Sequence, residues 1–180
     1  MEVAVPACRL GTPIQLLHHR PGAPGLRWGL GPGLWHRRAI SQLQALFADN
    51  SFWASGRSAR DLRRMLRGSE AAVSAWRGGR LVGFGRATSD GCYRAVLWDV
   101  VVARDVEGQG LGRQLVEGLL ASPSVSGAER VYLMTTNSAG FYRQLGFSDA
   151  APQVLLVRAG RPSATPSQSP AGHSSSRDCS

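Results

Sequence analysis

The sequence predicts an α/β protein, an α+β sandwich in which helices flank one mixed, mostly antiparallel sheet. Two helical segments precede three consecutive strand-like segments, and the chain then alternates helix, strand, helix and strand. This order differs from the regular alternation of a doubly wound parallel fold. At 180 residues and 43% hydrophobic composition, the chain fits one domain with an ordinary core.

The chain is expected to divide into one folded domain and two flanking segments. Proline and glycine interrupt the N-terminal region, so residues 1–24 are interpreted as a poorly defined extension. A short strand fits near residues 26–30, inside a folded domain of residues 25–159. Residues 160–180 are rich in Ser and Pro, a composition that is typical of a disordered tail.

Two helices are predicted at the start of the folded domain. Apolar side chains in residues 34–48 have helical spacing, namely Leu34, Ile40, Leu43 and Phe47. A second helix begins at Ser58, because Asp61 follows three residues later as in a capping box. Gly68 is in the position where this helix should stop.

Three strands are predicted in the middle of the chain. Residues 71–77 and 80–87 flank the dipeptide Gly78-Gly79, which suits a tight hairpin turn. A turn at residues 89–91 follows. The β-branched run over residues 93–102 should then form a central strand.

Helices and strands alternate in the C-terminal part. A helix is predicted over residues 110–122, with an apolar face made of Leu111, Leu115, Val116 and Leu119. Residues 130–136 should form a buried strand and residues 138–146 a short helix. The last strand is predicted over residues 153–159.

The charge of the chain favours an anionic ligand. The net charge is +9, and all the basic residues are arginine because the sequence contains no lysine. This excess would attract a phosphorylated cofactor, an acidic substrate or nucleic acid. The arginines are scattered among acidic residues and no nucleic-acid-binding motif is found, so nucleic acid is the least favoured of these partners.

The composition also bears on metal binding and on the cellular location of the protein. The three cysteines are widely spaced, which indicates neither a disulfide framework nor a zinc site, and no metal is expected. No apolar run is long enough to cross a membrane. Prolines interrupt the apolar part of the N-terminus, which makes it a poor signal peptide. A cytoplasmic protein without a membrane partner is predicted.

The most informative segment is residues 100–114, where a buried strand leads through a short loop into Gly108, Gly110 and Gly112. Glycines let the backbone approach a ligand closely, and the N–H groups of the helix that follows favour a phosphate. A Walker A loop is excluded because it needs a lysine, and Arg113 replaces the third glycine of a Rossmann fingerprint. On the glycines alone, a helix entry without any ligand remains an equal alternative.

Two segments together resemble a known family. The segment WDVVVARDVEGQGLGRQLV, residues 98–116, resembles motif A of the GNAT acetyltransferases, and NSAGFYRQLGF, residues 137–147, resembles their later tyrosine-containing motif. The match is closest in appearance to the cyanobacterial and plastid-type branch and covers about residues 35–150. One position departs from the family pattern. Glu107 stands where Gln or Arg is usual, and a carboxylate pointing at a pyrophosphate would repel it.

The resemblance implies the GNAT fold, with splayed central strands and acetyl-CoA as co-substrate. Pantetheine would lie between the strand that ends at Val102 and the strand of residues 131–135. Backbone groups of Val100, Val101 and Val102 would pair with pantetheine, and one N–H would polarise the thioester carbonyl. The residues implied in pyrophosphate binding are Gly108, Gln109, Gly110, Leu111, Gly112, Arg113 and Gln114, with a charge-assisted contact from Arg113.

The implied reaction is direct attack of a neutral primary amine on the thioester within a ternary complex. A base or a water chain must remove a proton from most amines, and Asp99, beside Trp98, is the candidate base. A structural carboxylate that bonds a neighbouring backbone or arginine is the alternative for Asp99. Tyr142 would protonate the departing thiolate, or else be a half-buried aromatic residue with its hydroxyl in water. Asn137 would cap the short helix or lie beside the cofactor.

Three aromatic residues are candidates for acceptor binding, namely Phe52, Trp53 and Trp98. The first two lie between the predicted helices, where they would line a pocket or anchor the loop to the core. The implied acceptor is a small arylalkylamine, a protein lysine or a protein N-terminus. The alternative is a non-catalytic GNAT-like module that binds coenzyme A or a regulatory partner. A homodimer is compatible with either function.

Overall fold

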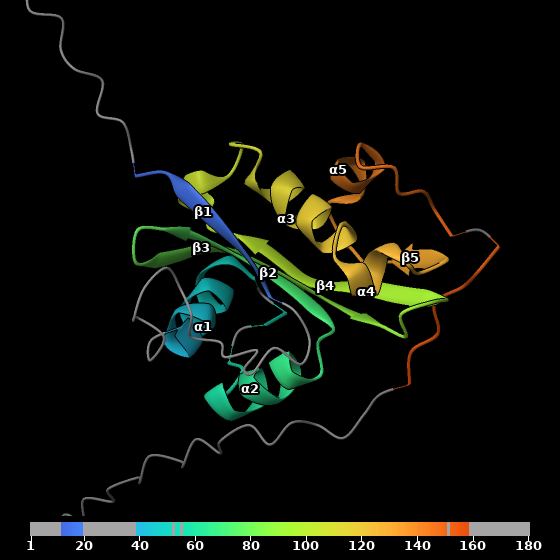
Figure 1. The fold of residues 1–180 in the computed structure, drawn as a ribbon, viewed down its shortest axis with the longest axis horizontal. Helices are drawn as coiled ribbons and strands as arrows, with labels where there is room; N and C mark the ends of the chain where they lie inside the picture. Colours follow the sequence, from blue (N-terminus) through green and yellow to red (C-terminus); the bar gives the residue numbers. More distant parts are fainter. Residues whose placement is uncertain (1–11, 20–38, 52, 55, 151, 159–180) are drawn as a thin grey trace, which may run out of the picture.

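A five-stranded sheet forms the centre of the protein (Figure 1). The computed structural model describes residues 12–19, 39–51, 53–54, 56–150 and 152–158. The strands follow one another across the sheet in chain order, and only the last pair is parallel. The predicted mixed, mostly antiparallel sheet is therefore confirmed. The strands are β1 (Ile14–His19), β2 (Ala71–Arg77), β3 (Arg80–Ser89), β4 (Arg94–Val102) and β5 (Arg130–Tyr132).

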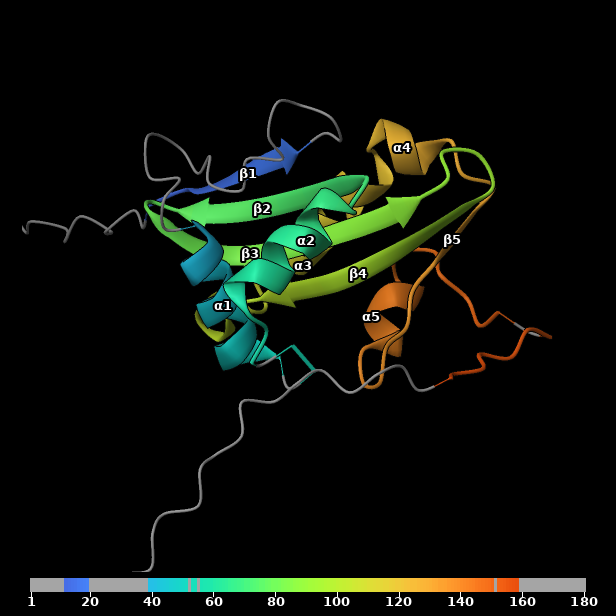
Figure 2. The same cartoon turned by 90° about the horizontal axis from the view of Figure 1, so that it is seen from below.

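Helices cover both faces of this sheet (Figure 2). One face carries α1 and α2, and the other carries α3, with two short helices after it. None of the described helices has the length and apolar character that crossing a membrane requires. The elements are α1 (Ala39–Asn50), α2 (Ala59–Arg67), the 3-10 turn η2 (Arg104–Val106), α3 (Leu111–Leu120), α4 (Pro123–Ser126) and α5 (Ala139–Arg143).

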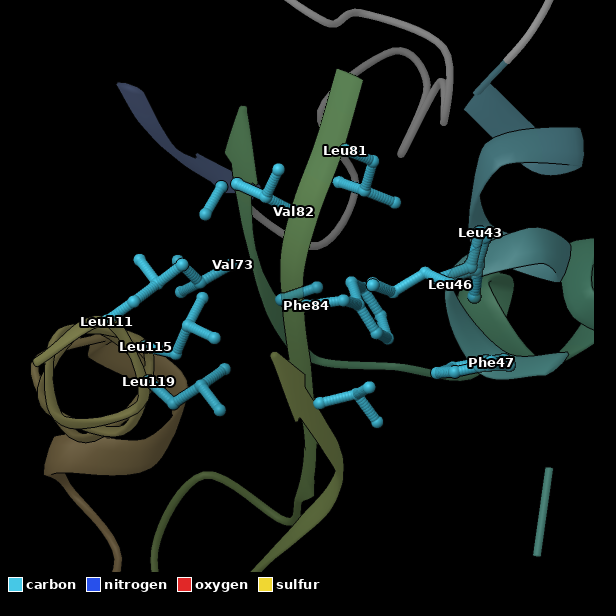
Figure 3. Close-up of a cluster of buried hydrophobic side chains, with 14 of the residues drawn as sticks. Leu43, Leu46, Phe47, Val73, Leu81, Val82, Phe84, Leu111, Leu115 and Leu119 are labelled. Carbon is cyan, nitrogen blue, oxygen red and sulfur yellow. The ribbon is translucent and has the colours of Figure 1, made fainter. Parts of the chain in front are cut away.

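The core has two layers of apolar side chains, one on each side of the sheet (Figure 3). On the α1 side, the rings of Phe47 and Phe84 meet edge to face with 5.8 Å between their centroids. On the α3 side, the helix lies so close that a Cβ on Gly83 would be 3.1 Å from Leu115 Cδ1. Full burial of one such Leu or Phe side chain contributes about 1.5–3 kcal/mol. The apolar face predicted for residues 110–122 is confirmed by the buried side chains of α3.

Local sequence signals placed the second helix and the hairpin correctly. The Ser58 hydroxyl accepts a hydrogen bond from the Asp61 N–H, and the chain leaves the helix at Gly68. The hairpin joins β2 to β3 through Gly78, whose φ of +60° favours glycine. Each of these devices acts within a few residues, which is why the sequence alone reveals it.

The first strand was not predicted. Strand β1 pairs along its whole length with β2, from Ile14 opposite Arg77 to His19 opposite Ala72. It therefore brings part of the expected extension, residues 1–24, into the sheet. Its six residues, IQLLHH, do not alternate strictly between apolar and polar, so they lack the pattern that indicates a half-buried strand. The strand predicted near residues 26–30 and the tail at residues 160–180 lie outside the described residues.

The prediction of a last strand over residues 153–159 was wrong. Residues 153–158 belong to no helix or strand, and the four apolar side chains of residues 154–157 are 67–87% exposed. Strand β5 is also shorter than predicted, since it ends at Tyr132 instead of residue 136. An apolar run favours a strand only where a neighbouring backbone can pair with it, and that condition is not readable from the run itself.

His19 is a mostly buried histidine on β1. Its Nε2 lies 2.8 Å from the Ser74 hydroxyl, to which the Trp76 indole N–H also donates at 2.9 Å. Burial, and to a smaller extent the neighbouring His18, lowers the pKa of His19 from 6.5 to about 4. The folded protein therefore holds this ring neutral at a pH where the unfolded chain would protonate it.

We predict that mild acid destabilises the protein through His19. Because the pKa is lower in the folded state, this contribution to stability is complete above pH 6.5 and is lost as the pH falls toward 4. The loss amounts to about 2 kcal/mol between pH 7 and pH 5. Urea unfolding at both pH values measures it. His19→Gln keeps a hydrogen-bonding side chain and should remove most of the pH dependence; an unchanged dependence would contradict the assignment.

Candidate active site

Strands β4 and β5 separate after a short parallel contact. Their pairing runs from Arg94 opposite Arg130 to Val96 opposite Tyr132, and there it ends. Strand β4 continues to Val102, so its backbone edge toward β5 is unpaired over residues 97–102. Free N–H and C=O groups along such an edge can pair with an extended ligand. The splayed central strands that the sequence resemblance implied are therefore present.

A β-bulge interrupts the pairing of β3 and β4 at the same place. Arg86 lies opposite Trp98, and Phe84 opposite Val101, so that two residues of β4 face Gly85 alone. One of these two residues is Asp99, whose φ of +53° is in the left-handed region. A left-handed backbone costs an ordinary L-residue roughly 1–2 kcal/mol, although Asp tolerates it better than most. A bulge of this kind bends its strand and increases the local twist.

The chain runs from β4 through η2 into the glycine-rich start of α3. Gly108 and Gly110 have φ values of +75° and +77°, and Gly110 is the N-cap of the helix. The first helical N–H to find an acceptor is that of Gln114, which donates to the Gly110 carbonyl at 3.2 Å. The N–H groups of the three preceding residues have no acceptor within the helix. Together with the helix dipole they form a site suited to a phosphate.

Charged side chains surround this turn. Arg80 and Arg77 both bind Asp105 of η2, and the hydrogen bond from Arg80 lowers the pKa of that carboxyl group. Arg113 lies 3.4 Å from Glu117 in an exposed pair one helical turn along. Glu107 is exposed, and its carboxylate forms no ion pair within the described part of the chain.

Tyr142 lies on α5, beside the start of α3. A Cβ on Gly112 would be 3.4 Å from Phe141 Cζ, so α5 packs against the first turn of α3. The Tyr142 ring meets the rings of Phe141 and Phe147 edge to face at 4.9 and 5.9 Å. Tyr142 thus packs against the core together with Phe141, and both residues are partly buried. Burial raises the pKa of Tyr142, so its hydroxyl is protonated at neutral pH.

Asn137 is not the cap of this helix. The N-cap of α5 is Ser138, whose side chain makes no capping bond. Asn137 Oδ1 instead accepts from the Ser138 hydroxyl at 3.2 Å, while the Ser138 N–H donates to Thr135 Oγ1 at 3.1 Å. A turn stabilised by these side chains precedes the helix and moves its start by one residue.

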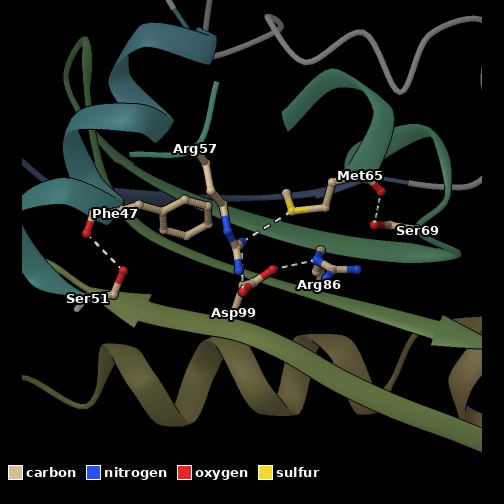
Figure 4. Close-up of polar contacts among 7 residues, drawn as sticks. All are labelled: Phe47, Ser51, Arg57, Met65, Ser69, Arg86 and Asp99. Atoms are coloured by element: carbon tan, nitrogen blue, oxygen red, sulfur yellow. Dashed lines mark hydrogen bonds and ion pairs between the residues drawn. The ribbon is translucent and has the colours of Figure 1, made fainter. Parts of the chain in front are cut away.

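Both carboxylate oxygens of Asp99 are held by arginines (Figure 4). Arg57 Nη1 lies 3.0 Å from Oδ1 and Arg86 Nε lies 2.6 Å from Oδ2, while the Asp99 side chain is 5% exposed. Of the two roles that the sequence left open, these contacts favour the structural carboxylate. Neither arginine was predicted from the sequence as a partner of Asp99. The available signal was Asp99 itself, because a carboxylate inside a buried β-branched strand needs a cationic partner.

The two described aromatic candidates for acceptor binding, Trp53 and Trp98, lie in different parts of the fold. Trp53 lies between α1 and α2 and is 49% exposed. Trp98 lies on β4, where its indole N–H donates to Thr88 Oγ1 at 2.8 Å and the Arg86 guanidinium is 5.6 Å from its ring centre. Phe52 lies outside the described residues. Across the described ranges, no three His, Cys, Asp or Glu side chains gather in a way that could hold a metal ion.

Comparison with known proteins defines the family. The model of the acetyltransferase (GNAT) family matches residues 40–147, more than half of the chain, and the chain belongs to this family. It is 39% identical over 117 residues to serotonin N-acetyltransferase 2, chloroplastic, of Oryza sativa subsp. japonica, covering 61% of this chain and 56% of the relative. It is 36% identical over 122 residues to histone acetyltransferase TAP1 of Glycine max, covering 67% of this chain and 49% of the relative.

The chain thus spans about half the length of these curated relatives. The resemblance to the plastid-type branch is confirmed, whereas the cytoplasmic location stays a prediction. Among solved structures, a GNAT-family acetyltransferase from Streptococcus pneumoniae TIGR4 superposes with a TM-score of 0.62 at 20% identity. The superposition covers 82% of this chain and 98% of the other, and it establishes the common fold.

Proposed function

We propose that this protein transfers an acetyl group from acetyl-CoA to a primary amine by direct attack in a ternary complex. The observation that carries the proposal is the open edge of β4 leading directly into the glycine-rich start of α3. The edge offers peptide groups to the amides of pantetheine, and the helix start offers N–H groups to the pyrophosphate. The residues that would hold acetyl-CoA are Val100, Val101, Val102, Gly108, Gln109, Gly110, Leu111, Gly112, Arg113, Gln114 and Asn137.

Two groups of this chain would act on the reacting atoms. A backbone N–H at Val100 or Val101 would stabilise the oxyanion that forms when the amine attacks the thioester carbonyl. As the C–S bond breaks, Tyr142 would donate its proton to the departing thiolate. The amine nitrogen loses its own proton to water, because both oxygens of Asp99 are bound to arginines. The products are an amide and free coenzyme A.

The acceptor is a small arylalkylamine, a protein lysine or a protein N-terminus. The names of the rice and soybean relatives include both a small amine and a protein substrate, and these names support the breadth of the proposal. Trp53, Trp98 and Phe52 are the proposed acceptor contacts. We further propose that the catalytic domain comprises residues 25–159, which contain the matched residues 40–147, together with β1 of the central sheet.

A second candidate is a GNAT-like module that binds coenzyme A weakly or not at all. The observation in its favour is Glu107, an exposed carboxylate at the turn where the pyrophosphate would bind. A negative charge there opposes a negative ligand, and the opposition is stronger at low ionic strength.

The first prediction concerns acetyl-CoA binding, measured by calorimetric titration. The wild-type protein should bind, and Glu107→Gln should bind about threefold to tenfold more tightly at low salt because a repulsive charge is removed. Glu129→Gln is the matched control, since Glu129 pairs with Arg94 far along β4 from the turn. Recovery of binding only in Glu107→Gln would favour the second candidate. Folded protein that binds in neither form would contradict the acetyltransferase proposal.

The second prediction tests the glycine turn. Gly110 and Gly91 have φ values of +77° and +81°, and a Cβ on either would meet open space. Alanine at each position should therefore lower the free energy of unfolding equally, by about 1 kcal/mol. Only Gly110→Ala should also weaken acetyl-CoA binding, because the added methyl group would occupy the open space at the turn where the pyrophosphate is proposed to bind. Equal affinities for acetyl-CoA in the two variants would count against this site.

The third prediction concerns Tyr142 as the acid. Tyr142→Phe keeps the ring contacts and removes the hydroxyl, so kcat should fall by about 10²-fold while the KM for acetyl-CoA changes little. The deficit should shrink with an acyl donor whose leaving thiol has a lower pKa, because that thiolate needs less help. Tyr93→Phe, at a side chain that is 63% exposed, is the control. A normal kcat in Tyr142→Phe would remove this residue from the mechanism.

A further inference from the structure

Asp99 combines a strained backbone with a buried charge. Its left-handed φ of +53° lies inside a strand, opposite Gly85, where β3 supplies one residue for two of β4. Such strain persists only where the surroundings impose it. A carboxylate that is 5% exposed also needs cations to offset the loss of water. Arg57 and Arg86 satisfy this need and thereby fix the orientation of the strained residue.

Arg57 is itself held from three sides, as Figure 4 shows. Its guanidinium lies 5.3 Å from the centre of the Phe47 ring on α1, and its Nη1 is 3.5 Å from Met65 Sδ on α2. The same Nη1 reaches Asp99 on β4. The connection between α1 and α2 is therefore attached to the bulge of β4 through one side chain.

A second contact attaches the other end of this connection. Asn50, the last residue of α1, accepts a hydrogen bond from the Arg104 N–H at 3.1 Å, and its own amide donates to the Leu46 carbonyl at 2.8 Å. The stretch of β4 and η2 between Asp99 and Arg104 is thus fixed at both ends to the segment from Asn50 to Arg57. The open edge lies between these two anchors.

We propose that the Arg57–Asp99–Arg86 cluster is a positioning device that sets the β4 bulge and so aligns the open edge of residues 100–102 with the pantetheine and thioester of acetyl-CoA. This inference rests on the proposed function. Asp99 acts through the backbone that follows it, and Arg57 makes the alignment depend on the position of the α1–α2 connection. In this role none of the three side chains would contact the reacting atoms.

The affinities for two ligands can distinguish this positioning role from a general effect of a substitution on the fold. Acetyl-CoA would use both the open edge and the glycine turn, whereas adenosine 3′-phosphate 5′-diphosphate lacks pantetheine and would use the turn alone. In Arg57→Gln, the affinity for acetyl-CoA should fall about tenfold, while the affinity for the nucleotide fragment stays within twofold of wild type. Arg57→Lys keeps a cation near Asp99 and should recover part of the loss. Arg60→Gln makes the same charge change at an exposed position of α2 and is the matched control.

Substitutions at Asp99 separate the side chain from the backbone shape. Asp99→Gly removes the strain and the carboxylate together, and acetyl-CoA affinity should fall as in Arg57→Gln. Wild-type affinity in folded Asp99→Gly would overturn the proposal, because the bulge would not need its cluster. Asp99→Asn with unchanged acetyl-CoA affinity, a large loss of kcat and an altered pH profile would also overturn it, in favour of a base.

Two further outcomes distinguish a failure of the positioning role from a failure of the proposed function. Equal weakening of both ligands in Arg57→Gln, with a lowered Tm, would overturn the positioning role and leave a structural one. Wild-type protein that binds neither ligand would instead refute the proposed function on which this inference rests.

Discussion

The unpaired half of β4 is the constraint on which the rest of the site depends. Among the described residues, β4 has neighbours on both sides only as far as Val96, and beyond that residue its edge toward β5 has no strand partner. Backbone N–H and C=O groups left without partners are unfavourable when they are removed from water. A ligand with its own peptide-like amides relieves this cost. The divergence of the two strands thus leaves unpaired peptide groups where the ligand is proposed to bind.

Arginine pairs fix the backbone at both ends of this open edge. Arg57 and Arg86 bind Asp99 before it, and Arg77 and Arg80 bind Asp105 after it. Each cluster has two cations for one carboxylate and so keeps one net positive charge, and the cluster at Asp105 lies next to the glycine turn where phosphates are proposed to bind. The arginines of these clusters therefore both hold the backbone in position and add positive electrostatic potential. This accounts for part of the arginine excess without any polyanionic partner.

The parts of the fold that were predicted correctly from the sequence are those that depend on residues close together in the chain. The cap at Ser58, the glycine hairpin at Gly78 and the apolar face of α3 each depend on residues a few positions apart. The glycine turn and Tyr142 were predicted from motifs that also span only a few residues, and their roles in cofactor binding and catalysis stay predictions. Strand β1, by contrast, exists because β2 lies beside it, far along the chain. The partners of Asp99 are 13 and 42 residues away, so the sequence revealed the need for a cation and not its source.

The arginine contacts of Asp99 and the burial of Tyr142 also bear on which groups of the proposed site can accept or donate a proton. A carboxylate held by two guanidinium groups offers no free oxygen to an incoming ammonium group, whereas the Tyr142 hydroxyl keeps its proton because burial raises its pKa. Under the proposed mechanism, the chain therefore supplies a proton to the leaving sulfur, and Asp99 does not take one from the attacking nitrogen. An amine must reach the carbonyl already neutral, so the fraction of neutral acceptor at the working pH enters the rate directly. Acceptors whose amines have pKa values near 7–8 make the smallest demand on such a site, and side-chain lysines, near 10.4, make the largest.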